Sequence, residues 1–143
     1  MVKRRPPLDW TALLLEEGPQ GILCIRKPNQ EHWQFPGGKR HAKDRDSRVT
    51  AVRESREETG VRLNIADINL VGSRQEFNHH THHPFRIDLY QVRLTDEKLA
   101  SHFAISREGE EVGVFTWAEL NEMGNFSPFH RMLAEKFGVW RTK

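Results

Sequence analysis

The sequence has one cysteine, Cys24, and lacks any long run of apolar residues. A single thiol excludes an internal disulfide and a cysteine-based zinc site. Because Cys24 lies in the apolar stretch 21–25, we expect it to be buried and inert. No stretch approaches the roughly 20 apolar residues of a membrane helix, and residues 1–7 lack the apolar segment of a secretory signal. We therefore expect a cytoplasmic protein with no membrane partner.

Strong net charge is also missing. The 143 residues carry a formal net charge of +2, and 36% of them are hydrophobic, which is the composition of an ordinary globular protein. This charge gives no strong signal for a nucleic-acid partner, but it is compatible with anionic small molecules. The length fits one domain over residues 1–143, in which residues 1–8 form a flexible basic tail.

The order of apolar and turn-forming segments predicts an α/β fold. Strands are expected at 10–15, 21–26, 68–77, 85–94 and 112–116, and helices at 47–59, 117–123 and after Ser127-Pro128. The polar stretch 95–110 is predicted to be an extended loop. A central helix between two groups of strands, followed by a terminal helix, favours a mixed sheet covered by helices.

The helix at 47–59 carries the first sign of chemistry. Asp46 or Ser47 can cap its start and Gly60 can end it. Glu54 stands three and four residues before Glu57 and Glu58, so all three carboxylates share one helix face. Their repulsion costs roughly 0.2–0.5 kcal/mol per pair, and a bound Mg²⁺ or Mn²⁺ would remove it.

An alternative without metal also fits these glutamates. Arg53 and Arg56 lie on the same helix and could pair with the carboxylates, leaving an ordinary exposed, charged helix. The neighbouring sequence favours the metal site. A loop that can bend tightly, Phe35-Pro36-Gly37-Gly38, precedes the helix by some fifteen residues.

These residues resemble the signature of the Nudix (MutT-like) family, G-x5-E-x7-R-E-U-x-E-E-x-G-U, in which U is aliphatic. The match begins at Gly38 and continues with Arg53-Glu54, Glu57-Glu58 and Gly60-Val61. Three positions depart from it. Asp44 stands in place of the first glutamate, eight residues rather than seven separate it from Arg53, and Ser55 replaces an aliphatic residue. A match of this complexity is specific.

The resemblance implies a Nudix-type α/β/α sandwich, with a mixed sheet between helices and a catalytic loop-helix-loop. It also implies an enzyme, a pyrophosphohydrolase that uses Mg²⁺ or Mn²⁺ to hydrolyse a phosphoanhydride bond in a nucleotide. The metal ligands it implies are the carboxylates Glu54, Glu57 and Glu58 and the backbone carbonyl of Gly37.

The remaining roles in the reaction also follow from the resemblance. Arg53 would orient the glutamates through a charge-assisted fork. For activation of the attacking water we favour Glu54, with Glu111 second because it stands just before the strand at 112–116, like the later metal-site carboxylate of the family. For Glu108 and Glu110 we expect a solvated loop.

Substrate contacts are predicted at Gly38 and Lys39 of the glycine loop and at the aromatic residues Trp33 and Phe35, which could stack on a base. For Phe35, core packing is at least as good an interpretation. Four histidines at 79–83 form a loop that is predicted to be exposed or to line the substrate cleft rather than to hold a metal.

Secondary marks of ADP-ribose, dinucleoside polyphosphate and NADH hydrolases are absent. The leading substrate is therefore a nucleoside triphosphate, cleaved to a monophosphate and pyrophosphate. A nucleotide sugar, a dinucleoside polyphosphate, a capped RNA end and a Nudix-like module that binds nucleotide without turnover stay open, as does a homodimer.

Overall fold

The chain is described at residues 9–142 by a computed structural model, and the predicted flexible tail at 1–8 lies outside this range. The strands are β1 (Asp9–Gly18), β2 (Gly21–Arg26), β3 (Gly37–Lys39), β4 (Asn69–Asn78), β5 (His83–Arg93) and β6 (Glu111–Phe115). The helices are α1 (Ser47–Thr59), α2 (Asp96–Ala100), α3 (Trp117–Glu122) and α4 (Pro128–Lys136), with a 3₁₀ turn at Ile65–Asp67.

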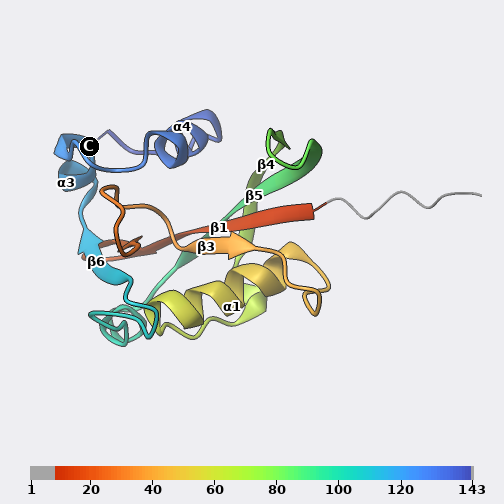
Figure 1. The fold of residues 1–143 in the computed structure, drawn as a ribbon. Coiled ribbons are helices and arrows are strands. Elements are labelled where there is room, and N and C mark those ends of the chain that lie inside the picture. The colour runs from red at the N-terminus through yellow and green to blue at the C-terminus, as the bar shows by residue number, and fades with distance from the viewer. Residues whose placement is uncertain (1–8, 143) are drawn as a thin grey trace, which may run out of the picture.

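The six strands form one mixed sheet in the order β4-β5-β1-β2-β6, with β3 paired to β1 beside this path. β1 and β5 run parallel, and the other pairs are antiparallel. Helix α1 covers one face, and α3 and α4 lie on the other (Figure 1). The predicted α/β/α sandwich is confirmed.

Alternation along β1 explains the two layers of core. Leu14 packs in the cluster that contains Ala51 of α1, while its neighbour Leu15 packs in the cluster that contains Leu120 and Leu133 of α3 and α4. Successive side chains of a strand point to opposite faces, so one strand serves both cores. Cys24 is fully buried in the second cluster, as predicted.

Two elements differ from the sequence-based prediction. Gly37 and Gly38 belong to a short strand, because the loop settles antiparallel against Leu13 and Ala12 of β1. The stretch 95–110 contains helix α2, whose start is capped by the Thr95 hydroxyl accepting from the Lys98 N–H. Among residues 9–142, no helix is long and apolar enough to cross a membrane.

Helix α1 is fixed at both ends. Asp46 caps its start by accepting a hydrogen bond from the Val49 N–H, and Gly60 ends it at φ 82°, a left-handed conformation that suits glycine. The hydroxyl of Ser47 lies 2.5 Å from both the Asp88 carboxylate and the Tyr90 hydroxyl of β5. These buried contacts set the position of the helix over the sheet.

The middle of α1 is held by a buried polar pair. Ser55, which stands where the family signature has an aliphatic residue, donates a hydrogen bond of 2.8 Å to Glu16 of β1. Both residues are fully buried, and the second carboxyl oxygen of Glu16 has no partner among the described residues. Burial raises the pKa of Glu16 to about 8, although the hydrogen bond from Ser55 opposes the shift.

Candidate active site

The site forms where β3 lies across α1. Glu58 is buried and accepts a 2.7 Å hydrogen bond from the backbone N–H of Gly37. Two positions of β3 require glycine, Gly37 because of its contact with β1 and Gly38 because of its contact with α1. A Cβ on Gly37 would lie 2.1 Å from the carbonyl oxygen of Ala12, and a Cβ on Gly38 would lie 2.6 Å from the carboxylate carbon of Glu54.

A third carboxylate completes the cluster. Glu110, at the end of the loop before β6, is only 5% exposed and lines the same hollow as Glu54 and Glu58. It accepts a 2.6 Å hydrogen bond from the Ser106 hydroxyl. The prediction that Glu110 belongs to a solvated loop is therefore wrong, because the turn at Ser106 folds it inward.

The structure does not bring Glu111 to this hollow. Its carboxylate lies 2.9 Å from Arg26, the residue that faces it across the β2–β6 pair, and half of its side chain is exposed. Glu111 is the first residue of β6, and its pairing with Arg26 of β2 keeps its carboxylate away from the cluster. Of these two neighbours, Glu110 lines the hollow and Glu111 does not.

Crowding of carboxylates changes their protonation. Burial, then the neighbouring carboxyl groups of Glu110 and Glu54, raise the pKa of Glu58 to about 9, against the lowering effect of the Gly37 N–H. Burial also raises the pKa of Glu54, while Arg53 opposes the shift. Part of this cluster is therefore protonated near neutral pH unless a cation compensates it.

Arg53 is the cation that organises the outer carboxylates. It donates to Glu54 at 2.9 Å, to Glu57 at 3.2 Å and to Asp44 at 2.9 Å. Asp44 is buried and also accepts from the Thr50 hydroxyl and the His41 N–H. The hydrogen bonds from Arg53 hold the pKa of Asp44 well below its usual value, although burial acts in the opposite direction.

This arrangement corresponds to the fork predicted for Arg53. Glu57 is exposed, whereas Glu54 and Glu58 point toward β3. Asp44 reaches Arg53 despite its shorter side chain, because the loop before α1 folds it into the protein. Asp44 and Ser55, the two residues that depart from the family signature, thus both have hydrogen-bond partners.

The predicted aromatic contacts divide into two cases. Phe35 is fully buried and packs against Phe126 and His130, whose ring nitrogen accepts from the Phe35 N–H at 3.1 Å. Its proposed stacking on a base is therefore wrong. Trp33 is half-buried, packs edge-on against Phe115 at 4.8 Å and lies under the Arg26 guanidinium; its role toward a base stays a prediction.

Oxygen donors and charge suit a hard divalent cation at this hollow. The hollow has a volume of about 250 Å³ and is lined by the carboxylates of Glu54, Glu58 and Glu110, the two glycines of β3, and Lys27, Pro28 and Lys39. Glu108 also lines it and is exposed, as predicted for a solvated loop. Within residues 9–142, no three His, Cys, Asp or Glu side chains stand ready as a complete ligand set. The raised pKa of Glu58 nevertheless fits such an ion, because a cation can replace the proton.

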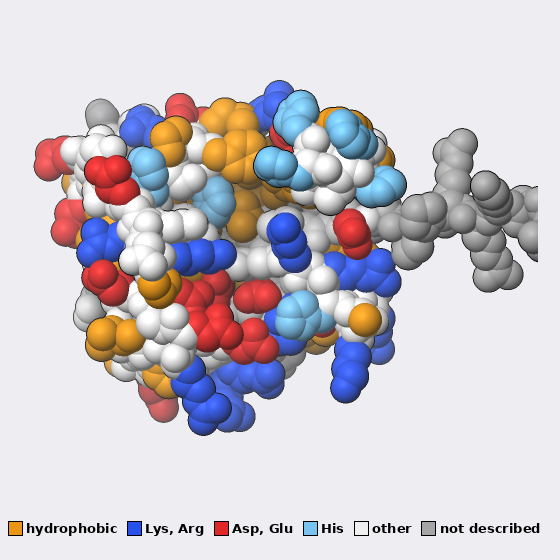
Figure 2. All heavy atoms as spheres, viewed as in Figure 1, with side chains coloured by type: hydrophobic (Ala, Val, Ile, Leu, Met, Phe, Trp, Pro, Cys, Tyr) orange, Lys and Arg blue, Asp and Glu red, His pale blue; other side chains and the backbone are white. Residues whose placement is uncertain are grey.

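The site occupies the middle of one face of the molecule. Figure 2 shows acidic side chains gathered there. Above them lies a separate depression with hydrophobic walls, and a group of histidines stands on its rim. Lysine and arginine side chains lie on either side of the acidic group. A ligand that carries both phosphate and apolar groups would meet complementary surfaces on this face.

Known proteins share this family and fold. The family model of the NUDIX domain matches residues 5–137. No curated protein is similar enough in sequence to match. Among solved structures, the MutT protein from Bacillus halodurans superposes with a TM-score of 0.69 at 21% identity, over 94% of this chain and 85% of that one.

Two further structures show the range of similarity. The NUDIX domain of Shewanella oneidensis NrtR, solved with ADP ribose, superposes with a TM-score of 0.65 at 17% identity, over 92% of this chain and 87% of that one. The MutT/nudix family protein from Enterococcus faecalis gives a TM-score of 0.63 at 18% identity over 80% of this chain, which spans 46% of that longer one. The family match over residues 5–137, together with the shared fold, shows that this chain belongs to the Nudix family of MutT-like hydrolases and is a Nudix pyrophosphohydrolase.

Proposed function

We propose that this enzyme uses Mg²⁺, with Mn²⁺ as a substitute, to hydrolyse a nucleoside triphosphate to a monophosphate and pyrophosphate. The observation that carries the proposal is the crowding of Glu54, Glu58 and Glu110 beside the backbone of β3. Carboxylates held this closely bind either protons or a cation, and phosphoanhydride hydrolysis depends mainly on positioning and charge neutralisation.

Each residue of the cluster has a distinct part in the proposal. Glu54, Glu58 and Glu110 bind the metal, with the Gly37 carbonyl, and Glu57 joins them from the exposed side. When bound, the metal neutralises phosphate charge and lowers the pKa of a coordinated water. Among these carboxylates, Glu54 is the one that we assign to accept a proton from the attacking water.

The residues around the cluster position these groups. Arg53 holds Glu54 and Glu57 in place and is itself fixed by Asp44. Lys39 and Lys27 stand at the rim of the hollow, where their charges can meet substrate phosphates. Gly38 lies on the same short strand, and its lack of a side chain leaves room for a ligand beside Glu54.

Other substrates are compatible with the same bond cleavage. The ADP ribose bound to the Shewanella oneidensis domain supports a nucleotide ligand and keeps a nucleotide sugar as the second candidate. A dinucleoside polyphosphate would also place an anhydride at the cluster. A module that binds without turnover is disfavoured, because all three glutamates of the signature helix are retained.

The proposal is tested by measuring phosphate and pyrophosphate release with Mg²⁺ over a panel of nucleoside triphosphates, nucleotide sugars and dinucleoside polyphosphates. Glu58→Gln is expected to lower the rate at least about 100-fold, since it removes a metal-binding charge. Glu31→Gln, on the exposed loop before Trp33, is the matched control and should keep the wild-type rate. Equal rates in the two variants would exclude this site.

A further inference from the structure

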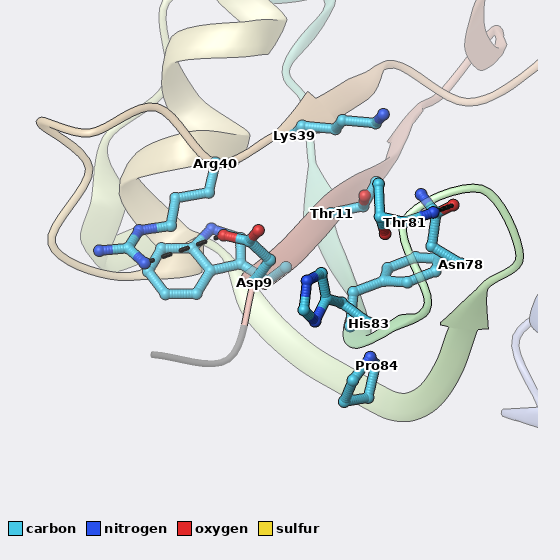
Figure 3. Close-up of a pocket in the computed structure, with 10 residues that line it drawn as sticks. Asp9, Thr11, Lys39, Arg40, Asn78, Thr81, His83 and Pro84 are labelled. Atoms are coloured by element: carbon cyan, nitrogen blue, oxygen red, sulfur yellow. Dashed lines mark hydrogen bonds and ion pairs between the residues drawn. The ribbon is translucent and has the colours of Figure 1, made fainter. Parts of the chain in front are cut away.

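A second hollow adjoins the carboxylate cluster on the far side of β3. It has a volume of about 220 Å³ and lies between the start of β1, the end of β3 and the tip of the β4–β5 hairpin (Figure 3). Sites for whole drug-sized ligands usually measure roughly 300–1,000 Å³. The hollow therefore suits one end group of a ligand rather than an entire nucleotide.

Lys39 gives this hollow a positive charge that no ion pair compensates. The guanidinium of Arg40 stacks on the Trp10 ring at 4.7 Å and lies 3.9 Å from the Asp9 carboxylate, so its charge has a partner. Lys39 forms no ion pair with any residue in the described range. An unpaired ammonium beside a hollow favours an anionic ligand.

The hairpin tip supplies neutral and basic hydrogen-bonding groups opposite Lys39. Asn78 fixes the tip, because its side-chain oxygen accepts from the N–H groups of His80 and Thr81 at 2.9 and 3.2 Å. Thr81 and His83 of this tip line the same hollow as Lys39, and Thr81 lies between Lys39 and His83 in the view of Figure 3. A hydroxyl, an imidazole and an ammonium can all donate a hydrogen bond to a phosphoryl oxygen.

The two hollows share one residue. Lys39 lines both the carboxylate cluster and the hollow below the hairpin. A phosphate chain that has its anhydride bond at the carboxylates can therefore continue past Lys39 without leaving the protein surface. The three-residue strand β3 is the only element of the described chain that lines both.

We propose that the hollow formed by Lys39, Thr81 and His83 binds the γ-phosphoryl group of a nucleoside triphosphate, the group that follows the two phosphoryl groups joined by the cleaved anhydride bond. This inference rests on the proposed function and narrows it. Of the four histidines in the loop it assigns His83 to substrate selection. It also makes a nucleoside triphosphate a better substrate than the matching diphosphate, which has no third phosphoryl group to place there.

The kinetic test compares His83→Ala with His79→Ala. His79 lies on the same tip but packs against Phe77 and does not line the hollow. For a nucleoside triphosphate, His83→Ala should raise KM about tenfold with kcat unchanged, as expected for the loss of one hydrogen bond to a charged group. For the diphosphate, KM should stay as in the wild type. A change that is equal for both substrates, or equal in both variants, would overturn the proposal.

A binding test separates this proposal from the proposed function. Inorganic phosphate, titrated into the metal-free protein by calorimetry, should bind more weakly to His83→Ala than to wild type or His79→Ala, even if no nucleotide is hydrolysed. Phosphate should also compete with the triphosphate and not with the diphosphate. Binding that depends on His83 without such competition would assign the hollow to a free anion and overturn the substrate assignment.

Discussion

Among single residues, Glu58 has the environment that best explains the site. It is buried, it is hydrogen-bonded to the backbone of β3, and its pKa of about 9 results from burial and from the carboxyl groups nearby. An isolated buried carboxylate is destabilising, whereas one beside Glu54 and Glu110 can share a cation with them. The fold therefore brings several carboxyl groups together at this position, although their crowding lowers the stability of the folded protein in the absence of a cation.

Glu16 is a second buried carboxyl group, and it gives a prediction about stability. Its pKa lies near 8 in the folded protein, above the ordinary value of 4.5, so the folded state binds its proton more tightly than the unfolded state does. Its contribution to stability is complete below about pH 4.5 and is lost as the pH rises through about 8.

Glu16→Gln removes this titration. As the pH rises from about 5 to about 8, the free energy of unfolding should fall more in the wild type than in the variant. The difference should be a few kcal/mol, since one pKa unit corresponds to about 1.4 kcal/mol. Urea denaturation at the two pH values measures the difference, with the exposed Glu111→Gln as control. Parallel losses in the wild type and Glu16→Gln would show that Glu16 is ionised in the folded protein.

Sequence spacing predicted some of these residues and missed others. The fork from Arg53 to the glutamates was implied by the resemblance to the family signature, and helical spacing by itself accounts only for its i,i+4 contact with Glu57. The choice between Glu110 and Glu111 could not be made from the sequence. It depends on where β6 begins, and a shift of one residue exchanges the face on which each side chain lies.

Among the secondary-structure elements, the contact between β3 and α1 is the one that forms the site. The short strand passes directly over the carboxylates, and Gly38 leaves no side chain between its backbone and Glu54 of the helix. The sequence predicted the close approach but not the strand, because Pro-Gly-Gly is typical of turns. Pairing with β1 overrides that local tendency.

Gly38→Ala tests this contact. The added methyl group would lie 2.6 Å from the carboxylate carbon of Glu54, which can move away because it ends a flexible side chain. We therefore expect the rate with Mg²⁺ to fall at least about tenfold, since displaced catalytic groups lose their alignment. The melting temperature should change little.

Gly124→Ala is the matched control, because a Cβ at Gly124 meets no atom within 4 Å. It should keep both the rate and the melting temperature of the wild type. If Gly38→Ala also keeps the full rate, the position of Glu54 under β3 is not important for the reaction.

In the whole molecule, the sheet and its two helical layers place all the candidate groups on one face. The acidic cluster, the hydrophobic hollow and the histidine group lie side by side there (Figure 2). The layers were predictable from the order of strands and helices. The adjacency of the hairpin tip to β3 was not, because it depends on the parallel pairing of β1 with β5, which brings distant parts of the chain together.

Two adjacent glutamates test the central claim, that the carboxylate cluster under β3 cleaves the anhydride bond. Glu110→Gln and Glu111→Gln make the same chemical change at neighbouring positions. The amide oxygen introduced by Glu110→Gln can still accept the hydrogen bond from the Ser106 hydroxyl, so the variant should fold. Mg²⁺-dependent hydrolysis of a nucleoside triphosphate is measured for both. The account predicts a loss of at least about 100-fold in kcat for Glu110→Gln and a wild-type rate for Glu111→Gln; a loss confined to Glu111→Gln would contradict it.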